Sequence, residues 1–202
     1  MKINMKCSRY LIVLLVLTQS AISFAQNKPF TINSGEVISK GIEMHDKQNY
    51  AGAIAEYQKV PENDTNFVLA MYELAVSARA DSQLTLAKSA INKALENLPS
   101  PYEHDLYTQM GSVYDEENKL DSGLIYFNRA IQKFPNSSYA YHAKGINLTI
   151  AKNYDSAIWY FQKAVLINPY SENSHYFLGL IANEKGYPIQ AMMSYGMCLM
   201  IS

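Results

Sequence analysis

Cysteine and clustered histidine are almost missing from this 202-residue sequence. Only Cys7 and Cys198 occur, and they lie near opposite ends of the chain. The four histidines are scattered, without a Cys-x-x-Cys or His-x-x-x-His pair among them. Such closely spaced pairs are what a protein zinc site usually requires. We therefore predict no metal site and no cofactor.

The sequence also lacks the short motifs of common enzyme classes. It has no G-x-S-x-G elbow, no phosphate loop and no Rossmann glycine cluster. Its one acidic run, Asp115-Glu116-Glu117, lies at the end of a predicted helix, where we expect a solvated face. Paired carboxylates catalyse only when they are held across a cleft, which a single run cannot do. The sequence thus predicts a protein that is not an enzyme.

A hydrophobic run long enough to cross a bilayer is missing too. The run from Tyr10 to Leu17 is shorter than the roughly 20 residues that a helical span needs. Basic residues precede this run, and the small residues Ser23 and Ala25 stand where signal peptidase reads its substrate. We predict a signal peptide over residues 1–25 and no integral membrane span after its cleavage. A retained N-terminal anchor is the alternative.

Export and charge restrict the partners. Cys7 precedes the apolar run, so it does not match a lipoprotein cysteine, and we expect the protein in the periplasm or the outer envelope. Removal of residues 1–25 takes away three basic side chains and moves the formal charge from −1 to about −4. A mildly acidic protein is poorly suited to neutralising phosphates, so we predict no nucleic-acid partner. Cys198 is then the single cysteine, and we expect it to be a small core residue.

What the sequence does contain is a repeat of about 34 residues. Five small residues recur within it, separated by 34, 36, 34 and 34 positions: Gly41, Ala75, Gly111, Gly145 and Gly179. Twelve residues after each comes another small one: Ala53, Ala87, Gly123, Ala157 and Ala191. Four further on sits a large apolar residue: Tyr57, Ile91, Phe127, Phe161 and Tyr195. Proline closes three of the units: Pro99, Pro135 and Pro169.

This pattern predicts pairs of antiparallel helices, with small residues where the two helices approach closely and proline after the second. One such pair cannot bury its apolar face alone, so neighbours must stack. After a short leader at 26–33, we expect a single repeat domain over 34–202. Its five predicted units are 34–66, 67–101, 102–137, 138–171 and 172–202. The predicted helices are 34–47, 51–60, 67–80, 83–97, 102–117, 120–133, 137–151, 154–167, 171–185 and 188–201.

The repeated positions resemble those of the tetratricopeptide repeat (TPR) family. The segment from Lys152 to Ala164 is the strongest match, and the resemblance extends from Ser34 to Ile201. It implies an all-α, right-handed superhelical solenoid whose concave face is lined by the first helix of each unit. Carried over position by position, it places these residues in a partner-binding groove: Ile42, Tyr72, Val76, Arg79, Thr108, Asp115, Tyr139, His142, Ile146, Tyr176 and Asn183.

The resemblance also implies what the groove holds. Some family members bind a peptide's terminal carboxylate with lysine, asparagine and arginine in the groove, and those positions here carry other residues, among them Ile42, Glu73 and Gln109. We therefore do not expect that clamp. Tyrosine combines an apolar body with a hydroxyl, so groove tyrosines suit a segment of a protein partner. The alternative is that these tyrosines pack within the array.

The last predicted helix, 188–201, is apolar on most of its surface and has no polar capping helix after it. A partner, a second copy or a continuation of the chain would cover it. Taken together, the sequence predicts a non-catalytic protein–protein interaction scaffold of the bacterial cell envelope. Two alternatives stay open: an N-terminal sensor module of a longer signalling protein, and a structural spacer whose groove binds nothing.

Overall fold

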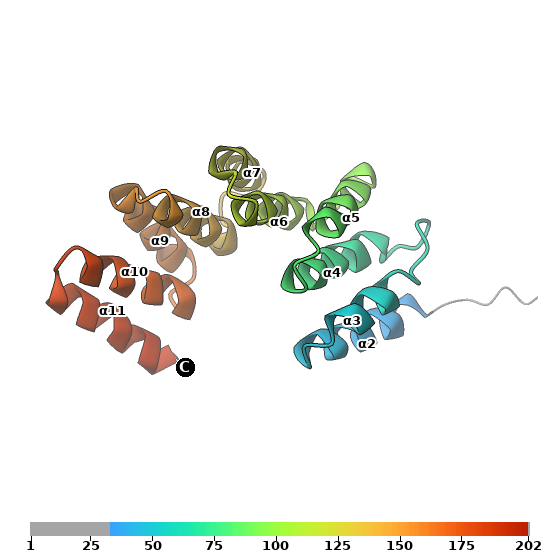
Figure 1. The fold of residues 1–202 in the computed structure, drawn as a ribbon, viewed down its shortest axis with the longest axis horizontal. Coiled ribbons are helices and arrows are strands. Elements are labelled where there is room, and N and C mark those ends of the chain that lie inside the picture. The colour runs from blue at the N-terminus through green and yellow to red at the C-terminus, as the bar shows by residue number, and fades with distance from the viewer. Residues whose placement is uncertain (1–32, 202) are drawn as a thin grey trace, which may run out of the picture. The chain divides into compact units, whose positions relative to one another are not determined.

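The structure is a computed structural model that describes residues 33–201. Every regular element within these residues is an α-helix, and the ten helices follow one another as five pairs (Figure 1). They form one compact unit. The all-α solenoid of five helical pairs is thus confirmed. The predicted signal peptide and nearly all of the predicted leader lie outside the described residues.

The helices keep close to their predicted positions. Their bounds are α2 Ser34–Asp46, α3 Tyr50–Tyr57, α4 Phe67–Ala80, α5 Leu84–Glu96, α6 Glu103–Glu116, α7 Leu120–Lys133, α8 Ser138–Ile150, α9 Tyr154–Ile167, α10 Glu172–Glu184 and α11 Pro188–Ile201. The largest difference is α3, which was expected to reach residue 60. The amides of Lys59 and Val60 instead bond to carbonyls three residues back, and Pro61 follows. The chain therefore leaves the α-helix one turn early.

The turn within each pair has the same backbone geometry. One residue in each turn has a positive φ: Gln48 (60°), Ser82 (58°), Asn118 (58°), Lys152 (59°) and Gly186 (74°). Only the last of these is glycine, the residue that adopts this conformation without strain. In two turns the next residue caps the following helix: the Asn49 side chain accepts from the Gly52 amide at 3.1 Å, and that of Asn153 accepts from the Ser156 amide at 3.4 Å.

The two helices of a pair pack with an aromatic ring over a glycine. A Cβ atom added at Gly111 would lie 2.6 Å from the ring of Phe127, and one at Gly145 would lie 2.7 Å from that of Phe161. Gly41 faces Tyr57 and Gly179 faces Tyr195 in the same way. The unit that has Ala75 in place of glycine has Ile91 in place of the aromatic residue, and both are fully buried. The small residue therefore makes room for a ring, not only for the opposite backbone.

The core consists of two hydrophobic clusters. One extends from Ile38 in α2 to Val113 in α6, and the other is centred on Leu148, Phe161 and Ile181 in the last two pairs. Successive first helices contact each other for α2 with α4, α4 with α6 and α6 with α8. A pocket with both apolar and charged walls lies among the first helices α4, α6, α8 and α10.

The last helix, α11, is largely uncovered in the described part of the chain. Of its described side chains only Ala191 is buried, whereas Ile189, Met193 and Leu199 are 66%, 67% and 80% exposed. Cys198 was expected in the core; it is half-buried instead, with its sulfur 3.7 Å from the Glu172 carbonyl, because α11 has no helix beyond it among the described residues. That a partner, a second copy or a continuation of the chain covers this face stays a prediction.

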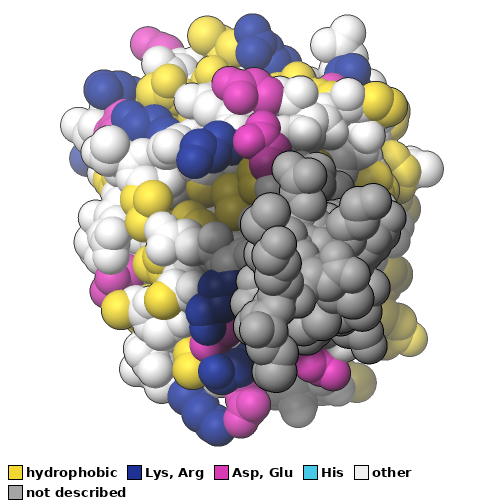
Figure 2. Space-filling model, turned by 90° about the vertical axis from the view of Figure 1, so that its right-hand side faces the viewer, with side chains coloured by type: hydrophobic (Ala, Val, Ile, Leu, Met, Phe, Trp, Pro, Cys, Tyr) yellow, Lys and Arg dark blue, Asp and Glu magenta, His cyan; other side chains and the backbone are white. Residues whose placement is uncertain are grey.

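None of the described helices is long and apolar enough to cross a membrane. On the described surface drawn in Figure 2, acidic and basic side chains are interspersed with hydrophobic ones. No extended field of one sign is visible on the described surface of that face. Partner selection by charge is therefore better sought in a specific pocket than on this broad surface.

Candidate functional site

A pocket of about 600 Å³ opens on the side of the array formed by the first helices of the pairs. Its walls come from α4, α6, α8, α10 and the link before α10. The lining residues are Arg79, Ser112, Asp115, Glu116, Ser138, Tyr139, His142, Ala143, Ile146, Ile150, Asn168, Ser171 and Asn173. We call it the central pocket. Five predicted groove residues line it: Arg79, Asp115, Tyr139, His142 and Ile146.

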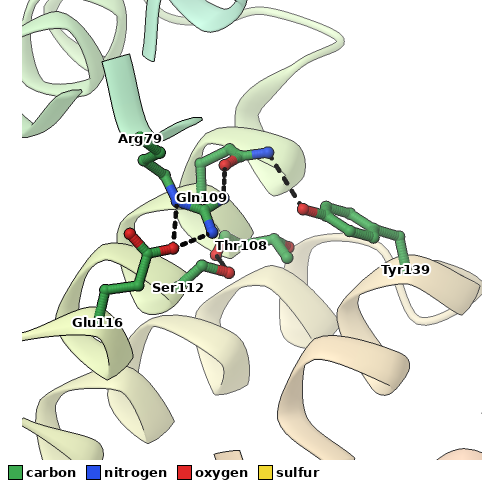
Figure 3. A network of polar contacts seen from close by, with 6 residues as sticks. All are labelled: Arg79, Thr108, Gln109, Ser112, Glu116 and Tyr139. Atoms are coloured by element: carbon green, nitrogen blue, oxygen red, sulfur yellow. Dashed lines mark hydrogen bonds and ion pairs between the residues drawn. The ribbon is translucent and has the colours of Figure 1, made fainter. Parts of the chain in front are cut away.

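One wall of the central pocket is a polar network that joins three helices (Figure 3). Arg79 of α4 donates to the Glu116 carboxylate through Nε at 3.1 Å and through Nη2, and to the Gln109 side chain through Nη1. Gln109 Nε2 in turn donates to the hydroxyl of Tyr139 in α8 at 3.1 Å. Because α4, α6 and α8 each contribute a member, the network fixes their relative positions at the pocket and holds Tyr139 by its hydroxyl. Tyr139 nevertheless remains 40% exposed.

Asp115 occupies a half-buried position in the same wall. Its Oδ1 accepts a hydrogen bond of 2.6 Å from Nδ2 of Asn147, which is completely buried and also donates to the Leu120 carbonyl at 2.9 Å. A Cβ at Gly123 would come within 2.2 Å of the same carboxylate oxygen, so this small residue leaves room for Asp115.

The electrostatics of Asp115 differ from those of a solvated carboxylate. Burial raises its pKa from 3.8 to about 6, and the nearby Glu116 carboxylate adds to the increase. The hydrogen bond from Asn147 and the positive charge of Arg79 act in the opposite direction. The carboxylate is therefore charged at neutral pH, although the fold disfavours the charge.

His142 lies at the other side of the central pocket and is neutral at neutral pH. Burial lowers its pKa from 6.5 to about 4. Its Nδ1 lies 2.9 Å from the Ser174 hydroxyl, and its ring packs against Phe161 and Phe177 at centroid distances of 5.4 and 5.6 Å. His142 thus links α8 to α10 and contributes no charge.

Apolar side chains complete the lining. Ala143, Ile146 and Ile150 follow one another on α8, at the helical spacing that puts them on one face. Ile150 is 49% exposed. The central pocket therefore combines an aliphatic strip with a charged wall, a combination suited to binding an amphipathic segment.

The other predicted groove residues lie outside this lining. Val76 is half-buried, whereas Ile42 and Asn183 are exposed. Tyr72 is half-buried and stacks on Tyr102 at 6.1 Å, so for this ring the alternative of packing within the array describes most of its contacts. Tyr176 is 47% exposed and touches Phe177 edge-on.

Two sequence-based expectations are wrong. Thr108 is completely buried and cannot touch a groove ligand, because its hydroxyl turns back to donate to the His104 carbonyl at 2.9 Å and α8 packs against α6. The acidic run is not simply a solvated face. Asp115 is half-buried, Glu116 pairs with Arg79, and Glu117 pairs with Lys88 and Lys119.

Sequence reasoning did not include three residues that shape the central pocket among the binding residues of the groove. It considered Gln109 only as a departure from a carboxylate clamp and Glu116 only as part of the acidic run. Glu116 and Gln109 anchor Arg79, and Ile150 adds to the aliphatic strip. The signal for Ile150 was present, since it follows Ile146 by four residues on a helix. The pairing of Glu116 with Arg79 spans 37 positions between units and has no local signal.

Within residues 33–201, no group of three or more His, Cys, Asp or Glu side chains is arranged to hold a metal ion. The arrangement can form hydrogen bonds, ion pairs and apolar contacts with a ligand. The Ser174 hydroxyl lies next to the His142 imidazole, as a nucleophile lies next to a base, but Ser174 is completely buried.

Comparison with known proteins agrees with this fold. A family model described as "Tetratricopeptide repeat" matches residues 105–137, which cover α6 and α7. The Protein STIP1 homolog of Dictyostelium discoideum is 27% identical over 112 residues, or 52% of this chain. The chain spans only about a fifth of that relative's length, since the match covers 20% of it.

Solved structures match over most of the array. The crystal structure of MamA superimposes with a TM-score of 0.59 and 22% identity over 80% of this chain and 93% of its own. Pseudomonas aeruginosa PilF gives a TM-score of 0.69 and 18% identity over 84% of this chain and 76% of its own. YrrB, described as a TPR protein with an unusual peptide-binding site, gives 0.54 and 21% over 90% of this chain and 91% of its own. At such identities the likeness concerns the fold. One repeat of the chain thus matches the tetratricopeptide repeat model, and the described array shares the helical solenoid fold of these structures.

Proposed function

We propose that this protein is a non-catalytic interaction scaffold that holds a segment of a partner protein in the central pocket. The observation that carries the proposal is a preformed pocket whose anchor ring, Tyr139, is partly exposed while its hydroxyl is fixed by Gln109. A ring that is already positioned loses little conformational freedom on binding, which favours affinity. That YrrB is described as having a peptide-binding site is consistent with a peptide-sized ligand here.

We further propose that the scaffold acts outside the cytosol, in the periplasm or at the outer envelope. Support comes from the basic N-terminus, the short apolar run and the small residues at 23 and 25. A single cysteine in the chain after residue 25 is compatible with an oxidising compartment, since it has no internal partner for a disulfide. The partner would then be another exported or membrane-anchored protein.

Affinity capture with a matched pair of variants tests the pocket. Tyr139→Ala removes the anchor ring, which is 40% exposed, whereas Tyr187→Ala removes a 50% exposed tyrosine outside the central pocket. The proposal predicts that an envelope protein retained by the wild type is lost with Tyr139→Ala and kept with Tyr187→Ala, with both variants folded. Retention by both variants would place binding elsewhere or favour the spacer alternative. Loss with Tyr187→Ala alone would direct attention to α11.

A further inference from the structure

The charges lining the central pocket do not cancel. Arg79, Asp115 and Glu116 are its charged residues at neutral pH, because His142 is uncharged there. Arg79 is engaged by Glu116 through two nitrogens. Asp115 is therefore a carboxylate without an ion pair among the described residues, and the lining has one negative charge in excess.

Asp115 also has an oxygen available to a ligand. Asn147 bonds to Oδ1, and Oδ2 has no hydrogen-bond partner among the described residues. Oδ2 also reaches solvent, since the buried side-chain atoms without a hydrogen-bond partner in the described part of the chain are the Tyr57 hydroxyl and Oδ1 of Asn147. A cationic group entering the central pocket can therefore pair with this oxygen without breaking the contact to Asn147.

Further carboxylates extend the negative potential along α4 and α6. Asp105 lies close enough to the hydroxyls of Tyr72 and Tyr139 to contribute to the raised pKa of both phenols. Glu73, also near Tyr72, is half-buried and has no ion pair among the described residues. A negatively charged segment would be repelled by Asp115, Asp105 and Glu73, whereas a positively charged one would be attracted to them.

We propose that the occupant of the central pocket is a protein segment that presents a lysine or arginine next to an aliphatic side chain. The cation pairs with Asp115, and the aliphatic group packs on Ile146 and Ile150. The inference rests on the function proposed above and adds the chemistry of the ligand. The repulsion of acidic segments supplies selectivity that an apolar groove alone would not give.

Three labelled peptides of about ten residues test this inference by fluorescence anisotropy with the purified protein. They share the same leucine positions and carry lysine, glutamine or glutamate at the same intervening positions. The lysine peptide is expected to bind most tightly, by roughly tenfold or more over the glutamate peptide. Raising the ionic strength from about 0.05 to about 0.5 M should reduce that difference.

Two carboxylate variants locate the effect. Asp115→Asn should weaken the lysine peptide by roughly fivefold or more and the glutamine peptide by clearly less. Asp121→Asn removes the same charge from an exposed site on α7 and should have little effect. Equal responses to the two variants, equal binding of the three peptides, or no binding of the lysine peptide would each overturn the inference. Binding of all three that is lost with Tyr139→Ala would overturn the charge preference while leaving the pocket as the binding site.

Discussion

At the residue scale, the packing of each helical pair depends on two facing positions, a small residue on the first helix and a large one on the second. Four pairs of helices place an aromatic ring over a glycine, and the fifth combines Ala75 with Ile91. Compared with the other four pairs, this pair has one more methyl group on its first helix and an aliphatic side chain in place of the ring on its second. Interiors are packed closely enough that such volume changes are felt when they are made singly.

Gly145→Ala should destabilise the protein by about 1–3 kcal/mol, because its Cβ would lie 2.7 Å from the Phe161 ring. Combining it with Phe161→Ile recreates the alanine–isoleucine pair of the second unit. We expect the double variant to be more stable than the sum of the two single changes predicts. Urea unfolding of the four proteins measures the coupling, and strict additivity would contradict the packing described here.

Asp115 should make stability depend on pH. Its pKa is about 6 in the fold against 3.8 normally, so the folded state holds the proton more tightly. Its contribution favours folding below about pH 4 and is lost as the pH rises toward 6. The groups facing it are Arg79 from α4, Glu116 from α6 and Asn147 from α8.

Asp115→Asn keeps the hydrogen bond from Asn147 and removes the charge. The variant should therefore melt at a higher temperature than the wild type at pH 7, with the difference shrinking at pH 4. His142, whose pKa is lowered to about 4, destabilises both proteins equally as the pH falls below 6.5 and so cancels in the comparison. A difference that is the same at both pH values would show that the Asp115 charge is not disfavoured by the fold.

At the element scale, the turns within the pairs are conformationally strained. Four of the five residues with positive φ are not glycine, and such residues disfavour this region. The 34-residue register predicted where these turns lie. It did not predict which residue adopts the left-handed conformation, because Gln48, Ser82 and Lys152 carry no local signal for it.

Lys152→Gly should stabilise the protein by about 0.5–1 kcal/mol, since the relief of strain at φ 59° exceeds the entropy lost by glycine. Ala151→Gly is the matched control, because its φ of −70° is ordinary for helix. That neighbour should lose about 0.5–1 kcal/mol on the same change. Thermal unfolding of both distinguishes strain relief from a general effect of glycine in the turn.

The helices were predictable from sequence because each unit repeats the same pattern of small, aromatic and proline positions. The site was only partly predictable. Arg79, Tyr139 and Ile146 follow from their register on the first helices. Thr108 shares that register and is nevertheless buried, because contact between α6 and α8 depends on how the repeats stack. That stacking also sets the pairing of Arg79 with Glu116.

At the scale of the whole molecule, the proposed export of the protein predicts how the chain is processed. Expression of the full chain in a bacterial host should yield a mature protein whose N-terminus is Gln26 and which appears in the periplasmic fraction. N-terminal sequencing and cell fractionation measure both. An intact Met1 on membrane-bound protein would instead indicate the retained anchor, and an unprocessed protein in the cytosol would contradict export.

The most direct test of the central claim is photo-crosslinking from the central pocket in intact cells. A photoreactive amino acid replaces Ile150, which lines the pocket and is 49% exposed, or Ile125, which is 53% exposed on α7 outside it. We expect a discrete adduct with a partner protein from position 150 that is absent from position 125 and disappears with Tyr139→Ala. Adducts that form equally from both positions, or only from position 125, would contradict a partner held in the central pocket.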